Sequence, residues 1–218
     1  MKIPVTAGKN IILIFALLMV LVSCSKTRKE YYQDGVLKSE LTYKNKKLHG
    51  LQTWYYSNAN KQMECTYQDG MIEGKLTRWS FNGKVEREEF YTRNLRNGKS
   101  TAYFEDGHPF TEENYENDTL QGAYREYHPN GTLKINGNFE KGLYQGKWEY
   151  YDDKGLKVGE GIFDKGAGIL HGYYWNGKPI REVSYKNNEK EGTEIWYRED
   201  GTVEREVEYS QGKVITKE

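Results

Sequence analysis

A 24-residue period constrains this chain more than any other feature of its sequence. Four consecutive blocks of that length fill the stretch from Gly50 to Gly146. Each block closes on a glycine, and the closing glycines are Gly74, Gly98, Gly122 and Gly146. Self-similarity at a fixed period of this length is typical of repeat arrays, in which each unit packs mainly on its neighbours. The period therefore predicts an elongated array rather than a domain with one central core.

Within each block, two aromatic positions and one turn recur. The fifth place holds Tyr55, Trp79, Tyr103 and Tyr127, and the place seven residues before the closing glycine holds Tyr67, Tyr91, Tyr115 and Phe139. The turn pairs are Asn58-Ala59, Asn82-Gly83, Asp106-Gly107 and Asn130-Gly131, with Ala59 standing where a glycine is expected. Asn-Gly and Asp-Gly pairs are strong markers of β-hairpins, because both turn residues take a positive φ. The closing glycines predict a second tight turn, which leads from one hairpin to the next.

The segments after these turns alternate as strands do. In the last unit Val203, Val207 and Tyr209 share one face, and the intervening glutamates share the other. Alternation with period two is the signal of a half-buried strand, and the chain after residue 23 has no convincing stripe of helical period. The sequence therefore predicts an all-β fold, an elongated single-layer antiparallel array of β-hairpins. Stacked hairpins share rows of aromatic side chains, so the tyrosines are interpreted as mainly structural.

The period extends to both sides of the central blocks. A first unit begins at Tyr31, a sixth of 26 residues closes at Gly172, and a seventh of 20 residues closes at Gly192. We therefore expect about eight units over residues 31–218, with the first and last as caps. Residues 24–30 are short and polar, and they are interpreted as a flexible tether.

The first 23 residues have the composition of an export signal. Lys2 and Lys9 precede the apolar run from Ile11 to Val22, which is too short for a comfortable membrane span. The run ends in Leu-Val-Ser-Cys, which resembles a bacterial lipobox. That resemblance implies cleavage before Cys24, a thioether-linked diacylglycerol on its sulfur and an acylated new N-terminus. More than one acyl chain is enough for stable membrane anchoring.

Two other interpretations of the first residues remain open, namely an uncleaved membrane anchor and an ordinary secretory signal followed by a chance cysteine. If the lipobox is real, Ser25 in place of an aspartate favours the outer membrane of an enterobacterial-type envelope. With Cys24 lipidated, Cys65 is the only free thiol, so no intramolecular disulfide is possible.

Composition and charge argue against two classes of protein. Lysine plus arginine equals aspartate plus glutamate, 32 of each, which gives no clustered positive charge for nucleic acid. Aromatic residues make up 14% of the chain, and disordered chains are typically poor in them. The chain is therefore expected to fold and not to bind nucleic acid.

With the repeat laid out in this way, the chain resembles the MORN-repeat proteins, specifically the bacterial MORN-repeat-variant group. The segments WSFNGKVEREEFYTRNLRNG and WYREDGTVEREVEYSQGK show the shared order of aromatic, Asn/Asp-Gly turn, strand, second aromatic and closing glycine turn. The resemblance covers about residues 31–213. It departs at Ala59 and in the shortened seventh unit. The resemblance implies a hairpin array, and it associates the chain with antitoxin-like components, membrane attachment and protein scaffolding.

The sequence offers little support for catalysis. His49 and His171 share one repeat place with glutamate, glutamine and asparagine residues, so that place is interpreted as an exposed turn position. Cys65 lies on a strand face with Met63 and Tyr67, where packing is the expected role. No metal-ligand spacing and no phosphate loop opening a helix occur. We therefore expect no enzyme activity, no cofactor and no metal.

What remains is a surface for binding. Trp54 and Trp196 lie at the fourth place of their units, outside the fifth-place aromatic row, and they are candidates for a binding surface on the opposite face of the sheet. The alternative is that they cover the second face internally. The sequence favours a membrane-anchored lipoprotein that binds another protein as a scaffold or adaptor. An antitoxin-like immunity protein that neutralises an envelope toxin, and a glycan-binding module, remain as alternatives.

Overall fold

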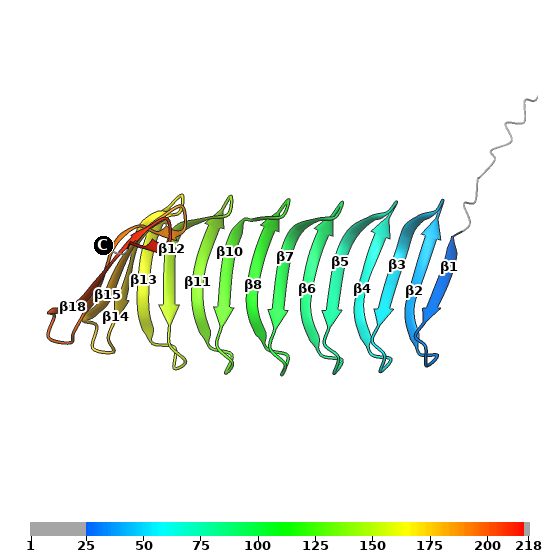
Figure 1. Cartoon of the computed structure of the whole chain (residues 1–218), viewed down its shortest axis with the longest axis horizontal. Helices are drawn as coiled ribbons and strands as arrows, with labels where there is room; N and C mark the ends of the chain where they lie inside the picture. Colours follow the sequence, from blue (N-terminus) through cyan, green and yellow to red (C-terminus); the bar gives the residue numbers. More distant parts are fainter. Residues whose placement is uncertain (1–24, 216–218) are drawn as a thin grey trace, which may run out of the picture.

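The computed structural model describes residues 25–215, and this part of the chain forms one open β-sheet of 19 strands with no helix (Figure 1). All strand pairs are antiparallel. The all-β prediction and the single-layer array are confirmed. The proposed signal peptide, residues 1–23, and the proposed lipidation site, Cys24, lie outside the described residues. Within the described part, no helix is long and apolar enough to cross a membrane.

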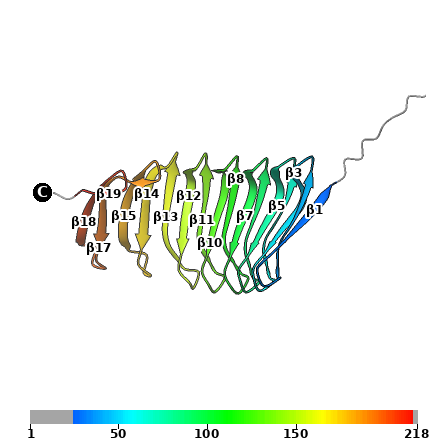
Figure 2. The same cartoon turned by 45° about the vertical axis from the view of Figure 1, so that its right-hand side comes forward.

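The strands follow one another along the chain as a continuous meander. Their bounds are β1 Lys26–Tyr31, β2 Leu37–Lys44, β3 Lys47–Tyr55, β4 Lys61–Gln68, β5 Met71–Trp79, β6 Val85–Thr92, β7 Leu95–Tyr103, β8 Pro109–Glu116, β9 Thr119–Leu120, β10 Gly122–Tyr127, β11 Leu133–Glu140, β12 Leu143–Tyr151, β13 Lys157–Asp164, β14 Ala167–Tyr173, β15 Pro179–Lys186, β16 Glu189–Lys190, β17 Gly192–Tyr197, β18 Val203–Ser210 and β19 Lys213–Val214. The first and last strands lie at opposite ends of the elongated sheet (Figure 2).

The array begins earlier than the sequence suggested. The residues assigned to a flexible tether largely form β1, which pairs with β2 from Lys26–Tyr43 to Tyr31–Leu37. The tether interpretation is therefore wrong for residues 26–30. A strand at the edge of a sheet can be polar on both faces, because it is covered on one side only, and such a strand carries no alternating signal.

The turn between hairpins also differs from the prediction. Eight two-residue turns have positive φ at both positions, 48° to 54° at the first and 63° to 89° at the second, which is the type I′ conformation. They are Asn45-Lys46, Asp69-Gly70, Arg93-Asn94, Asn117-Asp118, Lys141-Gly142, Lys165-Gly166, Asn187-Asn188 and Gln211-Gly212. In most units this turn precedes the closing glycine by four residues, so the closing glycine does not form the turn.

Four closing glycines lie inside strands, at bulges: Gly50, Gly74, Gly98 and Gly146. Gly50 in β3 has a φ of 79°, and the pairing around it jumps from Leu41–Gln52 to Tyr43–Leu48. The strand that carries the glycine thus holds extra residues relative to its partner, which is a β-bulge. Glycine suits this place because a positive φ is strained for residues with a Cβ.

The Asn-Gly and Asp-Gly pairs do form the hairpin loops, but with a different geometry. In the second unit the amide of Ala59 donates to the carbonyl of Tyr56, and the amide of Tyr56 donates to the carbonyl of Asn60. Only the second residue of each pair has a positive φ, as Ala59 does at 66°. This is a type I turn followed by one left-handed residue, and the type I′ prediction for these pairs is wrong.

Ala59 should be a removable source of strain. We expect Ala59→Gly to raise the free energy of unfolding by about 0.5–1 kcal/mol, since a left-handed alanine costs about 1–2 kcal/mol and glycine returns part of that gain as chain entropy. Chemical denaturation of both forms measures the change. The reverse substitution at the matching loop position, Gly83→Ala, should lower stability by a similar amount. Equal stability of Ala59→Gly and the parent chain would contradict the strain.

The two faces of the sheet differ in character. One face, here called the core face, carries the residues Gln52, Cys65, Leu76 and Val183, each at most 1% exposed. The other, here called the charged face, carries threonines and opposed Lys–Glu pairs, for example Lys75–Glu88 with an Nζ–Oε1 distance of 2.5 Å. A single-layer sheet survives in water because each face packs its own side chains along the array.

Gln52 shows how the core face accommodates a bulge. Its side-chain amide accepts a hydrogen bond from the amide of Thr42 at 2.8 Å and donates to the carbonyls of Thr42, His49 and Gly50 at 3.0–3.2 Å. The bulge at Gly50 disrupts the ladder, and the Gln52 side chain replaces the lost partners. Buried backbone groups need such partners, because leaving one unpaired costs free energy.

The sheet changes direction from β12 onward, and its main aromatic core lies there (Figure 1). Phe139, Trp148 and Phe163 are buried together on the core face. The Tyr144 ring lies 4.4 Å from the ring of Trp148 in the same strand and 6.4 Å from the ring of Tyr185, although two strands, β13 and β14, lie between Tyr144 and Tyr185 in the sheet. The bend closes the core face over these rings.

Glycines, which have no side chain, make this bend possible. A Cβ on Gly137 would lie 2.3 Å from the Trp148 ring, and one on Gly168 would lie 2.2 Å from the carbonyl oxygen of Ile162. Asn188 also bridges the bend, because it donates to the carbonyl of Gly142 and accepts from the amide of Tyr144, each at 2.8 Å. These glycines therefore make room for rings and for close backbone approach.

Candidate binding surface

Trp54 lies on the core face, near the N-terminal end of the array. It stands opposite Ser39 of β2 and Met63 of β4 in the pairing register. It therefore shares the core face with Cys65 and Tyr67. The fifth-place aromatics take the other face, since Tyr103 donates its hydroxyl to Glu88 of the charged face at 3.2 Å. Trp54 and the fifth-place row therefore lie on opposite faces, as the sequence predicted, and the face that carries Trp54 is the core face.

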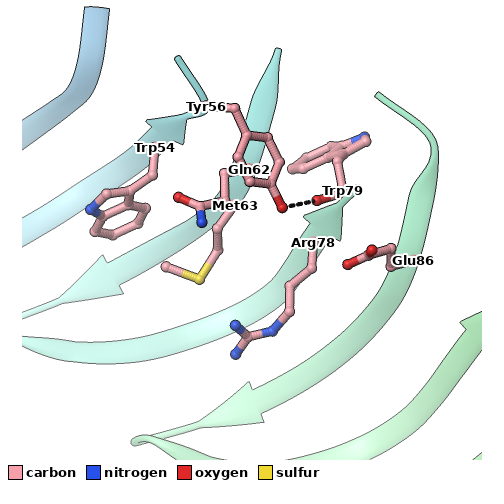
Figure 3. A pocket seen from close by; sticks show the side chains of 7 residues that line it. All are labelled: Trp54, Tyr56, Gln62, Met63, Arg78, Trp79 and Glu86. Carbon is pink, nitrogen blue, oxygen red and sulfur yellow. Dashed lines mark hydrogen bonds between the residues drawn. The ribbon is translucent and has the colours of Figure 1, made fainter. Parts of the chain in front are cut away.

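A hollow of about 260 Å³ opens beside Trp54 (Figure 3). Its walls come from consecutive strands β3, β4, β5 and β6 and from the loop that follows β3. They are formed by Trp54, Tyr56, Gln62, Met63, Arg78, Trp79 and Glu86. Ligand pockets for whole small molecules usually measure about 300–1,000 Å³. A hollow of this size suits one or two side chains of a larger partner.

The repeat holds the wall of the hollow in place. The hydroxyl of Tyr56 donates to the carbonyl of Trp79 at 2.9 Å, across to the next hairpin (Figure 3). Tyr32 and Tyr174 make the same bond 23 residues ahead, to Tyr55 and Tyr197. In these three units, the place after the fifth-place aromatic therefore links neighbouring hairpins.

An exposed ring extends the apolar rim of the hollow. Phe81 lies in the loop after β5 and is 52% exposed, and its ring is 5.4 Å from that of Tyr56 in an edge-to-face arrangement. Its carbonyl accepts hydrogen bonds from the side-chain amides of Asn58 and Asn60 at 2.7 and 2.9 Å. The loop between β3 and β4 thus holds the backbone of Phe81, and the Tyr56 ring of the same loop contacts its exposed ring.

A buried carboxylate lies close to the charged side chain of Arg78 at the hollow. Glu89 lies on the core face at 5% exposure, and its Oε2 is 3.8 Å from Nε of Arg78 and 3.3 Å from the hydroxyl of Tyr91. Burial and the nearby Glu89 raise the pKa of Tyr91, so its hydroxyl keeps its proton and can donate. About half of the Arg78 side chain stays exposed, which leaves a guanidinium facing the hollow.

Trp196, the second candidate, has a different environment. Arg181 and Arg205 stand on either side of it in the register, with guanidinium carbons 4.9 and 5.2 Å from its ring centre. Guanidinium groups at this distance attract the ring face. Trp54 and Trp196 lie in β3 and β17, near opposite ends of the sheet, so the structure does not bring them together (Figure 2).

A carboxylate close to Trp196 is paired on both oxygens. Glu194 is 2% exposed, and it accepts hydrogen bonds from Nε of Arg181 and from Nζ of Lys190, the latter at 2.7 Å. Burial alone would raise the pKa of Glu194, but these two cationic donors outweigh it and hold the pKa below the usual value of 4.5. The three residues form a structural ion-pair group.

The histidines make structural contacts rather than a cluster. The amide of Asp69 donates to Nδ1 of His49 at 3.5 Å, and at the same repeat place Glu73 and Gln121 accept from Arg93 and Lys141. That place accepts a hydrogen bond from the first residue of the next type I′ turn, so its interpretation as an exposed turn position is wrong. The sequence did carry a signal for this role, because the histidine, glutamate, glutamine and asparagine residues at this place all have a side-chain atom that can accept a hydrogen bond.

The two remaining histidines with side-chain contacts also act locally. Nε2 of His128 lies 2.9 Å from the carbonyl of Tyr151, the contact that Tyr56 makes in its own unit. Nδ1 of His171 lies 3.5 Å from Oε2 of Glu182. Over residues 25–215, no group of three histidine, cysteine, aspartate or glutamate residues is placed to hold a metal ion.

Cys65 is fully buried on the core face, between Gln52 and Leu76 in the register. Burial raises the pKa of its thiol to about 11, against a smaller lowering by Arg78. A thiol with this pKa is almost wholly protonated at neutral pH, and the thiolate is the nucleophile. Cys65 therefore acts as a packing residue.

Comparison with known families picks out the hairpin unit described above. Five segments match the MORN repeat variant family, at residues 26–45, 48–69, 96–117, 120–141 and 190–211. This chain carries MORN-variant repeats. The four later segments each run from one type I′ turn to the next, and the first runs from β1 to such a turn, so each holds one central loop and its two strands. No curated protein matches the chain.

The matched segments also show where each repeat unit of the array begins and ends. The first matched segment starts at Lys26, the first residue of β1, which agrees with an array that begins before Tyr31. Residues 70–95 and 142–189 are unmatched, but they form the same paired hairpins. In the hollow, Trp54 and Met63 come from a matched segment, whereas Arg78 and Glu86 come from an unmatched one.

Proposed function

We propose that this protein is a lipid-anchored scaffold that binds another protein through the hollow beside Trp54. The observation that supports the proposal is the composition of that hollow, in which tryptophan, tyrosine, methionine and arginine side chains surround a space for one or two partner side chains. Trp, Tyr and Arg are enriched among the residues that dominate protein–protein binding energy. The exposed ring of Phe81 adds apolar area at the rim.

The anchor in this proposal is Cys24, acylated after removal of residues 1–23. Its support is the sequence alone, in the lipobox-like Leu-Val-Ser-Cys run. An anchor at the start of the array would leave the hollow, in the second and third hairpins, close to the membrane. The partner is then expected among proteins of the envelope, with the outer membrane favoured.

A pull-down from native membranes tests the binding proposal. The tagged full-length chain is cross-linked in the membrane and purified, and its co-purified proteins are quantified. We expect one stoichiometric partner whose recovery falls at least tenfold in Trp54→Ala, because truncation of a binding hot spot costs about 2 kcal/mol or more. Trp175→Ala is the matched control, since Trp175 is 84% exposed in a hairpin loop away from the hollow.

The same experiment separates the alternatives. A partner that is toxic when expressed without this chain would identify an antitoxin-like immunity protein. Recovery of an envelope polysaccharide in a Trp54-dependent manner, with no protein partner, would identify a glycan-binding module and refute the scaffold. In a parallel Cys24→Ala form, we expect an unprocessed or soluble chain. Unchanged membrane partition would count against the anchor.

A further inference from the structure

The two ends of the array each carry half of a repeat strand. At the N-terminal end, β1 corresponds to the second part of an interior strand such as β3. At the C-terminal end, β19 spans Lys213–Val214 and pairs with Ser210 and Tyr209 of β18. Among the described residues, nothing pairs with the outer edge of β1 or with residues 203–207 of β18 beyond their hairpin partners. Unpaired edges of this kind are templates for another strand.

The interior of the chain shows how two such halves fit together. Strand β15 pairs first with the short β16, at Tyr185–Lys190, and then with β17, at Glu182–Ile195 and Arg181–Trp196. Strand β8 pairs with β9 and β10 in the same manner. A short first piece followed by a longer second piece is thus a working strand of this sheet. Among the described residues, β18 pairs on its outer side with the short first piece, β19, and with no second piece.

The pairing within the hairpins shows in which register a further strand would pair with residues 203–207 of β18. Gly192 pairs with Tyr209 in the β17–β18 hairpin, and Lys26 pairs with Tyr43 in the β1–β2 hairpin, so β1 is the counterpart of β17. Likewise β18 is the counterpart of β15, with Arg205 and Glu206 at the places of Arg181 and Glu182. A β1 strand laid on β18 in the interior register therefore sets Glu30 opposite Arg205 and Lys29 opposite Glu206.

The charges at this register are complementary. Strand β1 holds three basic residues and one acidic residue, and β18 holds three acidic residues and one basic residue. Lys29 already lies 3.4 Å from Glu40 on its hairpin side, and Glu206 would add a second carboxylate on its other side. Opposite charges that face each other across strands stabilise the pair.

We propose that the β1 edge of one copy docks on the β18 edge of a second copy, so that the sheets continue head to tail. The contact joins two different surfaces, and such a contact does not close on itself after two copies, so it extends into a row. The occupant of each free edge is therefore another copy of this chain.

Cross-linking of the full-length chain in its membrane tests the proposal. Glu30→Cys and Arg205→Cys are combined in one chain, since residues directly opposite in an antiparallel pair have Cβ atoms about 4.5–5.5 Å apart. We expect a ladder of trimers and larger species with a short bismaleimide. The parent chain with its own two cysteines is the background, and Cys65 is buried within it. Lys84→Cys with Lys154→Cys, in two exposed loops, is the matched control.

Charge reversal on that cysteine background tests the register. Lys29→Glu or Glu206→Lys alone should lower the yield of multimers about tenfold, because an attractive pair becomes a repulsive one. The two reversals together should restore it. A chain that ends at Ile215 should still form the ladder. Dimers without larger species, no rescue by the double reversal, or equal yield from the loop control would overturn the proposal. So would a β1 end that binds phosphatidylglycerol vesicles while the ladder is absent.

Discussion

Trp148→Ala should lower the free energy of unfolding by about 3–5 kcal/mol, as expected for truncation of a buried tryptophan. Trp148 is only 3% exposed, its ring stacks on that of Tyr124 and meets that of Phe139 edge to face, and its Nε1 donates to the carbonyl of Asn138 at 3.2 Å. Because the ring fills the concave side of the bend, its removal also opens the contact between distant strands. Urea unfolding followed by circular dichroism measures the loss.

Trp175→Ala serves as the matched control for this substitution. Trp175 is 84% exposed, so its removal should change stability by no more than about 0.5 kcal/mol. An array can unfold in parts, and the C-terminal half should then lose protection first in Trp148→Ala. Hydrogen exchange of the backbone amides measures the protection of each half separately. Equal unfolding curves for both tryptophan variants would show that the aromatic cluster does not hold the bend.

Arg181→Met should lower the free energy of unfolding by about 3 kcal/mol at pH 7, because removal of one partner leaves the buried Glu194 carboxylate undercompensated. Lys190 remains as the second donor. The folded pKa of Glu194 in the parent chain lies below 4.5, so the stability it contributes is present above pH 4.5 and is lost as pH falls through the folded pKa. The difference between Arg181→Met and the parent chain should therefore narrow under acid conditions.

Denaturant titrations at pH 7 and below pH 4 measure this second effect. Arg181→Met combined with Glu194→Gln should recover much of the loss at pH 7, since no buried charge then remains. Arg205→Met is the matched control, because Arg205 also lies near the Trp196 ring, whereas the ion pairs of Glu194 are with Arg181 and Lys190. A loss that is the same at both pH values, or the same in both arginine variants, would assign the effect to packing.

The period, the hairpins and the all-β class were predictable because they depend on local chemistry. Asn-Gly and Asp-Gly pairs mark the loop positions correctly even where the turn type differs, since glycine and asparagine are among the residues that most readily take a positive φ. Trp54 was found as a candidate because it falls outside the regular aromatic row. The neighbours that complete its hollow, Arg78 and Glu86, were missed because they come from later hairpins.

The misplaced closing turn has a specific physical cause. Pairs such as Asn45-Lys46 and Arg93-Asn94 contain no glycine, so the glycine four residues later looked like the turn. Both kinds of place demand a positive φ, and a sequence pattern alone does not distinguish a turn from a bulge. The strand β1 was missed for a related reason, since an edge strand needs no apolar alternation.

The sequence by itself determined the repeat, the strand content and the places where the backbone needs a positive φ, because each depends on residues near one another in the chain. Only the tertiary structure decided which face each row takes, where the sheet bends and which side chains meet at the hollow. Those outcomes depend on register between strands. A bulge shifts register by more than one residue, and its consequences appear only when all the hairpins are laid side by side.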